Sequence, residues 1–461
     1  MRSAAPSTRH LALALALLAL IGVTPACKGS ASRPPEAGAG AAAAMGNWAQ
    51  WRDLSPLLDV ARTHAPKPTI TAIERARDHL RKGKPLAAER ALAQLADSEG
   101  RDWIAAARGD LAALYFSTCI RGVAWRIPES VEAVQGRTID FTEGAKVAPT
   151  DLAIEPLLVA LDQAVEAKVP ALALHARIAR ARVTAYVSRC APNEQVARLA
   201  QGIVKGDLAQ LAAEGHLTPD LAYLWGGIQL TEFSASAARP FLLQAREAGF
   251  DDPALLYLLA VVALEQRALE QADAYAREAL AAYKRQKDPD QEAQTAFLQG
   301  EIASARADKA AARSAYEAAL ARVPAHSAAL LALARLLLDA EGEPAAVTAI
   351  SAHLGAILGA GPLSPEAARK ASEELESLVI LISEPPVALL CRGALLDGID
   401  SEPEPLRRGL RYFYAATLDI RLGEFQAARG HAILARDELA EAPGEPPVDI
   451  GELLRNLDAL Q

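Results

Sequence analysis

The stretch ADKAAARSAYEAALARVP (residues 307–324) consists largely of small residues, and few of its side chains can take part in chemistry. Ala312, Tyr316 and Ala319 fall at helical spacing, so they share one face of a helix that ends before Pro324. Alanine is the best helix former, and its short side chain lets another helix approach closely. The stretch therefore predicts a helix whose small-residue face lies against a second helix.

The residues before this stretch supply that second helix. Two amphipathic helices are expected over 296–305 and 309–322, joined by a short turn, with Gly300 facing the small residues of the second. Antiparallel helices reach the lower end of the usual range of about 8–10 Å between axes only where long side chains are missing. The pattern predicts a tightly packed helical hairpin.

Small residues recur with a period near 34 along the middle of the chain. Ala260 follows Gly226 at this spacing, and Ala334 follows Gly300 at the same spacing. The step from Ala260 to Gly300 is 40 instead of 34, and the excess fits a polar insertion, KRQKDPDQ, at 284–291. Helix starts agree with this register, since a capping residue precedes a proline at four places: Thr218-Pro219, Asp252-Pro253, Asp288-Pro289 and Ser364-Pro365.

This pattern resembles the tetratricopeptide repeat (TPR), a two-helix unit of about 34 residues. The matching positions are Gly300, Ala312, Tyr316, Ala319 and Pro324 in one copy, Ala416, Gly423, Phe425, Ala428 and Ala435 in a second, and Ala76, Gly83, Ala88 and Leu95 in a looser third. The resemblance covers residues 218–355 and 408–440, and more loosely 68–98. It implies an all-α fold, a TPR-like α-solenoid of helical hairpins.

The chain is expected to divide into six segments. They are a signal peptide (1–26), a flexible tether (27–46), an N-terminal helical region with a degenerate repeat (47–217), TPR-like repeats (218–355), a degenerate helical unit (356–407), and a C-terminal TPR-like repeat with a tail (408–461). Within the third segment, residues 120–147 alternate apolar and polar side chains around Trp125 and again around Ile139. This alternation predicts a small β-hairpin inserted between helices.

The first residues, MRSAAPSTRHLALALALLALIGVTPAC, have the features of an export signal. The apolar run from Leu11 to Val23 is too short to span a bilayer, which takes about 20 residues, but it suits a signal peptide. The ending TPAC resembles the lipobox of bacterial lipoproteins, although Thr24 stands where that motif usually has an aliphatic residue. The resemblance implies lipidation of Cys27 and, through Lys28, an outer-membrane location; plain cleavage after Ala26 is the alternative.

Composition excludes some functions and leaves the cysteine state open. The 461 residues are 51% hydrophobic and 23% charged, which is a globular composition, and the net charge of −9 argues against nucleic-acid binding. Beyond Cys27 the chain has Cys119, Cys190 and Cys391. Either the first two form a disulfide or all three are buried thiols.

No sequence motif predicts catalysis. The chain contains no HExxH, Walker A or G-x-S-x-G motif and no clustered Cys/His metal spacing, and its eight histidines are scattered singly. The acids of DPDQE (288–292) are better explained by a helix start than by a calcium loop. We therefore expect no catalytic residue, no metal and no cofactor.

The resemblance to TPR proteins implies a concave partner-binding groove lined by the first helix of each hairpin. At the fifth repeat position it places Tyr223, Tyr257, Phe297, Leu331 and Phe413, and at the ninth and thirteenth positions Glu265, Glu301, Arg335 and Asp339. Such a surface suits helix-in-groove or extended-peptide recognition. Alternatively, the aromatic residues fill the interior of the solenoid.

These expectations converge on a non-enzymatic scaffold, a lipoprotein of the cell envelope that binds another envelope protein or peptide through its groove. The membrane is contacted through the N-terminal lipid anchor, and otherwise the protein is secreted or periplasmic. The alternative is a helical enzyme or periplasmic solute-binding protein with a pocket inside the superhelix. That alternative requires titratable groups that converge on one place.

Overall fold

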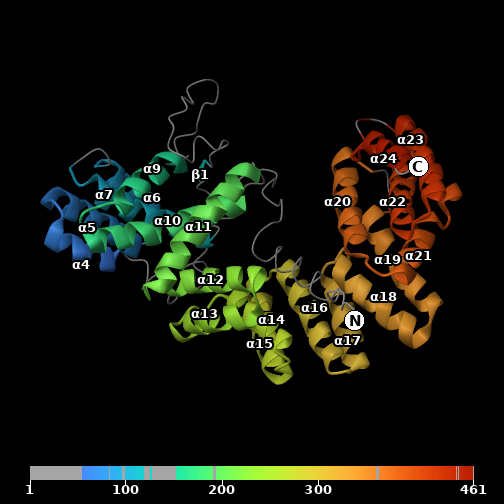
Figure 1. The fold of residues 1–461 in the computed structure, drawn as a ribbon, viewed down its shortest axis with the longest axis horizontal. Helices are drawn as coiled ribbons and strands as arrows, with labels where there is room; N and C mark the ends of the chain where they lie inside the picture. The colour runs from blue at the N-terminus through green and yellow to red at the C-terminus, as the bar shows by residue number, and fades with distance from the viewer. Residues whose placement is uncertain are drawn as a thin grey trace. The chain divides into compact units, whose positions relative to one another are not determined.

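The computed structural model describes residues 54–82, 84–95, 99–118, 125–126, 152–190, 194–359, 363–442, 444 and 446–459. These residues form two compact units, and the boundary between Leu258 and Leu259 falls inside helix α14 (Pro253–Glu265). The first unit contains the described residues up to Leu258, and the second contains those from Leu259 onward (Figure 1). Each unit is helical, as the sequence predicts.

Some predictions concern residues outside the described ranges. They are the signal peptide (1–26), the tether (27–46), lipidation of Cys27, and the state of Cys119, whose disulfide to Cys190 stays a prediction. Cys391 is a free thiol, and its burial raises its pKa to about 12. The buried-thiol alternative therefore holds for Cys391.

The first unit is built of consecutive helices that pack on their neighbours. They are α4 (Ser55–His64), α5 (Lys67–Arg81), α6 (Pro85–Ala93), α7 (Arg101–Thr118), α9 (Ile154–Val165), α10 (Pro170–Cys190), α11 (Glu194–Ala213), α12 (Pro219–Glu232), α13 (Ala235–Glu247) and the start of α14. Helix α10 packs against α7, α9 and α11, and α12 pairs with α13 as a hairpin. Leucine and alanine side chains from α4 to α11 share one core.

The second unit continues the pattern of hairpins. It contains the rest of α14, then α15 (Leu269–Gln286), α16 (Pro289–Ala305), α17 (Lys309–Arg322), α18 (Ser327–Glu341), α19 (Glu343–Leu358), α20 (Pro365–Leu381), α21 (Pro385–Leu396), the 3₁₀ turn η1 (Ile399–Ser401), α22 (Pro405–Leu422), α23 (Phe425–Glu441) and α24 (Ile450–Ala459). Helix α16 packs along α17, α18 along α19, and α22 along α23. The hairpin predicted from residues 296–322 is the pair α16–α17.

The four predicted helix starts are confirmed. Helices α12, α14, α16 and α20 each begin at the expected proline. Asp288 accepts a hydrogen bond from the Gln291 N–H (3.1 Å), and Ser364 caps α20 in the same way (3.2 Å). Thr218 differs, because its hydroxyl donates to the Asp220 carboxylate (2.7 Å) instead of capping α12.

Glycine stands where two helices of a hairpin cross. A Cβ added to Gly300 would lie 2.3 Å from the Tyr316 ring, and one added to Gly226 would lie 2.6 Å from Leu242. At Gly409 it would lie 2.6 Å from the Leu439 side chain and 3.3 Å from the Leu439 backbone nitrogen. The alanines that face these crossings, 312 and 319 among them, have no exposed surface. The close packing predicted from the small residues is therefore confirmed.

The inserted segment contains one described strand. Trp125–Arg126 (β1) pairs in parallel with Leu152–Ala153 (β2), which lies beyond the predicted insertion at 120–147. The second predicted strand, around Ile139, lies outside the described residues. The pairing that is seen joins the two sides of the segment, whereas a hairpin would pair antiparallel strands.

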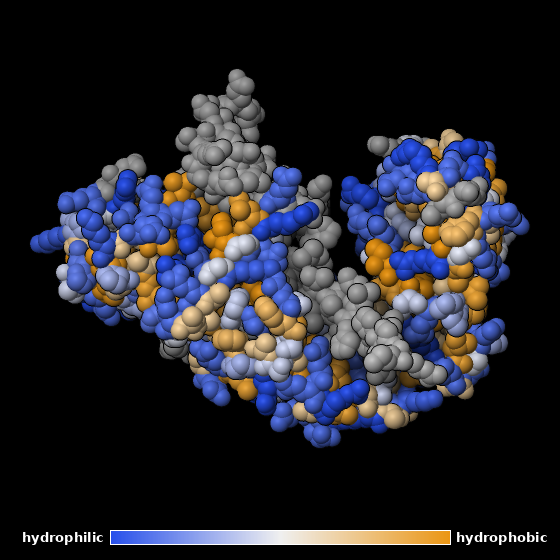
Figure 2. Space-filling model, viewed as in Figure 1, coloured by the Kyte–Doolittle hydropathy of each residue, from blue (hydrophilic) through white to orange (hydrophobic). Residues whose placement is uncertain are grey.

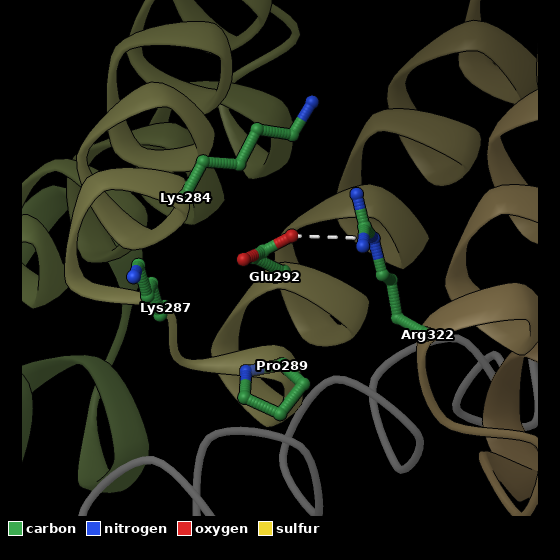
Figure 3. A pocket seen from close by; sticks show the side chains of 5 residues that line it. All are labelled: Lys284, Lys287, Pro289, Glu292 and Arg322. Atoms are coloured by element: carbon green, nitrogen blue, oxygen red, sulfur yellow. Dashed lines mark ion pairs between the residues drawn. The ribbon is translucent and has the colours of Figure 1, made fainter.

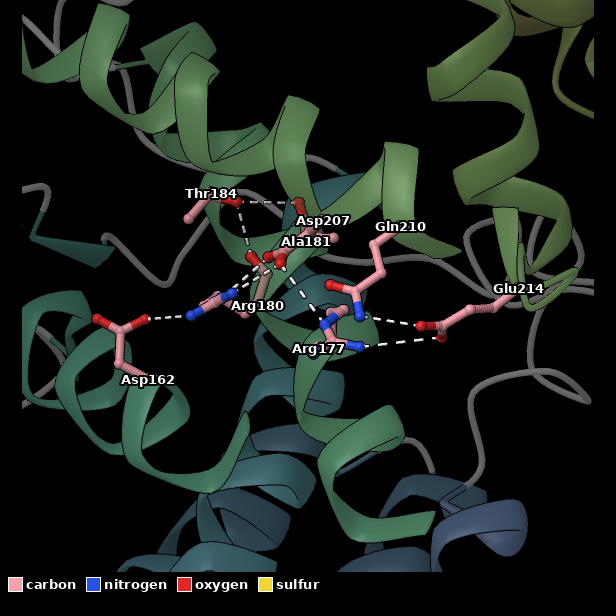
Figure 4. A network of polar contacts seen from close by, with 8 residues as sticks. All are labelled: Asp162, Arg177, Arg180, Ala181, Thr184, Asp207, Gln210 and Glu214. Carbon is pink, nitrogen blue, oxygen red and sulfur yellow. Dashed lines mark hydrogen bonds and ion pairs between the residues drawn. The ribbon is translucent and has the colours of Figure 1, made fainter. Parts of the chain in front are cut away.

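Arginines on α10 tie the helices of the first unit together. Buried Arg182 donates to both carboxylate oxygens of Asp220 (2.8 and 3.1 Å) and to Asp110 of α7 (2.6 Å). Arg180 bridges Asp162 of α9 and Asp207 of α11 (Figure 4). Removal of one partner from such a group leaves a buried charge without a counter-charge, which is strongly destabilising. These bonds therefore fix which helices are neighbours.

We predict opposite effects for two glycine-to-alanine substitutions in the α22–α23 hairpin. Gly409→Ala should lower the free energy of unfolding by about 1–3 kcal/mol, because its Cβ meets Leu439. Gly430→Ala is the matched control: it has open space and should raise stability by about 1 kcal/mol through helix propensity.

Urea denaturation followed by circular dichroism measures both effects. Tryptophan fluorescence does not serve, because all five tryptophans precede Leu258 and so report on the first unit. Stabilisation by both substitutions would contradict a close crossing at Gly409.

Candidate functional site

The aromatic and leucine residues predicted for the groove lie at two different depths. Tyr257, Phe297 and Leu331 are 2%, 5% and 3% exposed, so they are part of the core. Tyr223 and Phe413 are half-buried. The burial of the first three agrees with the alternative in which these side chains fill the interior.

Two of these rings, the buried Phe297 and the half-buried Tyr223, pack on other aromatic side chains. Phe297 lies with its ring centroid 5.9 Å from that of Tyr316 and 5.5 Å from that of His326. Tyr223 stacks on Phe250 at 5.0 Å, and this pair belongs to the first unit. These contacts fill the space beside the glycine and alanine crossings.

The predicted polar positions are more accessible, and all four belong to the second unit. Glu265 and Asp339 are exposed, and Glu301 and Arg335 are half-buried. Glu301 accepts a hydrogen bond from the Tyr316 hydroxyl (2.7 Å). Arg335 Nε lies 3.1 Å from a carboxylate oxygen of Glu384, which precedes α21, a partner that the repeat pattern does not reveal.

A hollow that the sequence did not predict as a site lies at the junction of α15, α16 and α17. It has a volume of 470 Å³ and is lined by Lys284, Lys287, Pro289, Glu292 and Arg322. Figure 3 shows Lys284 and Arg322 on opposite sides of the Glu292 carboxylate. Glu292 is only 7% exposed, and its Oε2 lies 3.2 Å from Arg322 Nε. The polar insertion at 284–291 is the sequence signal for this hollow, and three of the five lining residues belong to it.

His353 is buried within α19, and His326, which directly precedes α18, is half-buried. His326 caps α18, because its Nδ1 accepts from the Ala329 N–H (3.1 Å), and its Nε2 lies 3.0 Å from the Gln294 side-chain oxygen. Neither ring nitrogen of His353 has a hydrogen bond of good geometry. Burial lowers the pKa of each histidine to about 4; for His353 the Pro324 carbonyl opposes this shift, and the neighbouring His326 adds to it.

This pair predicts acid sensitivity of the second unit. Below pH 6.5 the unfolded chain binds protons that the folded chain excludes, so stability is full above pH 6.5 and is lost as the pH falls toward 4. Each histidine contributes roughly 3 kcal/mol to this loss. His353→Leu should therefore lessen the loss of helicity-monitored stability between pH 6.5 and 4.

The control substitution is His216→Leu, because His216 is exposed. It should leave the pH dependence as in the parent protein. An equal pH dependence of the His353→Leu variant and the parent would show that the folded chain does not exclude a proton from His353.

One carboxylate–imidazole pair has the composition of part of a catalytic triad. Asp419 is fully buried and lies 2.6 Å from His431 Nδ1, and it also accepts from Arg392 (2.7 Å). Tyr412 stacks on the His431 ring. Asp419 thus joins α21, α22 and α23, and no hydroxyl or thiol is hydrogen-bonded to His431 among the described residues. The contacts of Asp419 with Arg392 and His431 are therefore interpreted as links between neighbouring helices.

The exposed surface mixes polar and apolar residues. On the face drawn in Figure 2, hydrophobic residues are interspersed with hydrophilic ones over the described helices of each unit. The large apolar side chains with the most exposure are Phe233, Ile380, Leu389, Phe425 and Leu434. Within the described ranges, no helix is both long and apolar enough to span a membrane, and no group of three or more His, Cys, Asp or Glu side chains is placed to hold a metal ion.

Comparisons with known proteins give only a distant structural similarity. No protein family model matches the sequence, and no curated protein matches it. Among solved structures, the chain is similar to yeast Tom70, with 8% identity, coverage of 90% of this chain and 86% of that chain, and a TM-score of 0.34. It is also similar to the APC/C hetero-tetramer Cut9–Hcn1, with 12% identity, coverage of 88% and 86%, and a TM-score of 0.22.

Because both TM-scores are low, the class of the protein is argued from its own hairpins. Helices pair in sequence order, and small residues stand at the crossings with the expected register. The chain is an all-α helical-repeat protein of the TPR-like type.

Proposed function

We propose that the protein is a non-enzymatic scaffold that binds a protein or peptide of the cell envelope. The observation that carries this proposal is a row of polar side chains on the first helices α14, α16 and α18. Glu301 and Arg335 share the ninth repeat position, and Glu265 and Asp339 share the thirteenth; each of the four is exposed or half-buried. The fifth-position side chains of these helices are buried. The row is interrupted, because the ninth position of α14 is the buried Val261 and the thirteenth position of α16 is Ala305. Polar side chains on a rigid base suit recognition of an extended polypeptide.

We further propose that Cys27 is lipidated and that the protein is held at the outer membrane. The basis is the export signal and its TPAC ending, together with a Ser-, Ala-, Pro- and Gly-rich segment that could serve as a tether. A tether of this composition keeps the helical units close to the membrane while leaving their surfaces accessible.

Charge reversal on the first helices tests the scaffold. Glu265→Lys with Asp339→Lys changes two exposed acids of the second unit and should remove the main partner recovered by crosslinking in intact cells, while helicity and melting persist. Lysines in place of these acids would face the basic groups of a partner that fits the parent protein, and like charges across an interface weaken binding.

Asp437→Lys with Glu441→Lys is the control for this test. Both residues are exposed on α23, a second helix, and the change in net charge is the same. Recovery of the same partner by the first variant and by the control would contradict binding through the first helices.

Detergent partitioning tests the anchor. Cys27→Ala should move the protein from the detergent phase to the aqueous phase, because the acyl chains attach through this residue. A Cys391→Ala variant removes a buried thiol instead and should partition like the parent. Detergent-phase partitioning of Cys27→Ala at the parent level would rule out the lipid anchor.

A further inference from the structure

The hollow between α15, α16 and α17 is built by the residues that break the repeat period. The distance from Ala260 to Gly300 exceeds the usual repeat by six residues (40 − 34). Both helices beside the hollow are accordingly longer: α15 has 18 residues against 13 in α13 and 14 in α17, and α16 has 17 against 14 in α12 and 13 in α14. The end of α15 and the turn that follows it provide Lys284 and Lys287.

The charged groups of this hollow are poised for an additional partner. Among the described residues, neither lysine has a salt-bridge partner, and the ion pair of Arg322 joins its Nε to Glu292 Oε2 at 3.2 Å, with no hydrogen bond of good geometry to that oxygen. The two Nη groups of Arg322 therefore retain their donors, and a guanidinium can bind a carboxylate through two of them. Three cations and one carboxylate line the hollow, and the adjacent Asp288 uses a carboxylate oxygen to cap α16, so the lining itself carries an excess of positive charge in a protein whose net charge is −9.

Helix stabilisation explains only part of this arrangement. Lys284 and Arg322 lie in the last turns of α15 and α17, where a cation interacts favourably with the helix dipole. Lys287 lies beyond α15 in the left-handed conformation (φ 57°), which glycine or asparagine adopts at lower cost. Arg267 and Ala307 adopt the same conformation after α14 and α16, so the helix end does not require a lysine, and at Lys287 the side chain extends the cationic lining.

We propose that this hollow binds the carboxylates of an acidic peptide segment from a protein partner. Its volume of 470 Å³ accommodates several side-chain groups and exceeds what one inorganic phosphate fills. Lys284 and Lys287 are exposed at the rim of the hollow, and the buried Glu292 carboxylate lies between Lys284 and Arg322, so the cations are held apart at positions that the spaced carboxylates of a peptide can reach. Binding to an anionic membrane instead is one of the outcomes of the test below. The proposal rests on the proposed function only in that the ligand is a polypeptide, and it involves none of the residues of the first-helix test.

The experiment uses the full-length chain and a fluorescent peptide of glutamates, titrated by anisotropy at two salt concentrations. Lys284→Gln with Lys287→Gln should weaken binding about tenfold, and added salt should weaken binding to the parent. The control, Lys309→Gln with Lys370→Gln, makes the same charge change at exposed sites outside the hollow and should alter affinity less than twofold. A glutamine peptide of equal length should not bind.

A second variant distinguishes a role of Lys287 in peptide binding from a role in stabilising the fold. Lys287→Gly should raise the thermal unfolding midpoint and yet weaken peptide binding, an opposition that a purely structural lysine would not produce. Equal loss of affinity in the hollow variant and its control would overturn the proposal. So would lysine-dependent binding of inorganic phosphate, or of phosphatidylserine vesicles, without lysine-dependent binding of the peptide.

The proposal for the hollow and the proposal for the first-helix surface, formed by Glu265, Glu301, Arg335 and Asp339, can be contradicted separately. If Lys284→Gln with Lys287→Gln loses the peptide, while charge reversal of Glu265 and Asp339 leaves the crosslinked partner in place, the hollow is supported and the first-helix surface is not. If the lysine variant binds the peptide as the parent does, while charge reversal removes the crosslinked partner, the first-helix surface is supported and the hollow is overturned.

Discussion

Three hairpins depend on a close crossing at which one of the two helices has a glycine and therefore no side chain. At Gly300, Gly226 and Gly409 the partner's side chain occupies the space that a Cβ would need, and at two of them the partner's backbone nitrogen also lies near. Alanines around the crossings are fully buried but remove little apolar surface each. Such a fold gains stability from many small contacts between neighbouring hairpins, as in other repeat proteins.

Polar bonds between helices add specificity to this packing. In the first unit Arg182 and Arg180 connect α10 with four other helices, and in the second unit Asp419 connects α21, α22 and α23. A short apolar side chain tolerates several packing registers, whereas a guanidinium held between two carboxylates tolerates one. Small residues thus permit the approach of two helices, and charged residues select the partners.

The helices from α12 onward were the most predictable part of the molecule. A period near 34 with small residues in register located α16 and α17, and capping residues before prolines located four helix starts, because both signals depend on local geometry. The depth of Tyr257 and Phe297 was not predictable from register alone, since an aromatic side chain at that position can fill the interior or face a partner. The contacts of Arg335 with Glu384 and of Arg182 with Asp110 join residues far apart in sequence, and no repeat position encodes them.

The longer helix α15 has a consequence for how this architecture can diversify. Hairpins in a repeat array contact mainly their neighbours, so extra residues where α15 ends and α16 begins are accommodated at the edge without a shift of register further along the chain. The usual spacing returns between Gly300 and Ala334, immediately after the longer unit, which is an instance of this tolerance. Extensions at helix ends are therefore positions where binding side chains can be added to one repeat without a change in the packing of the others.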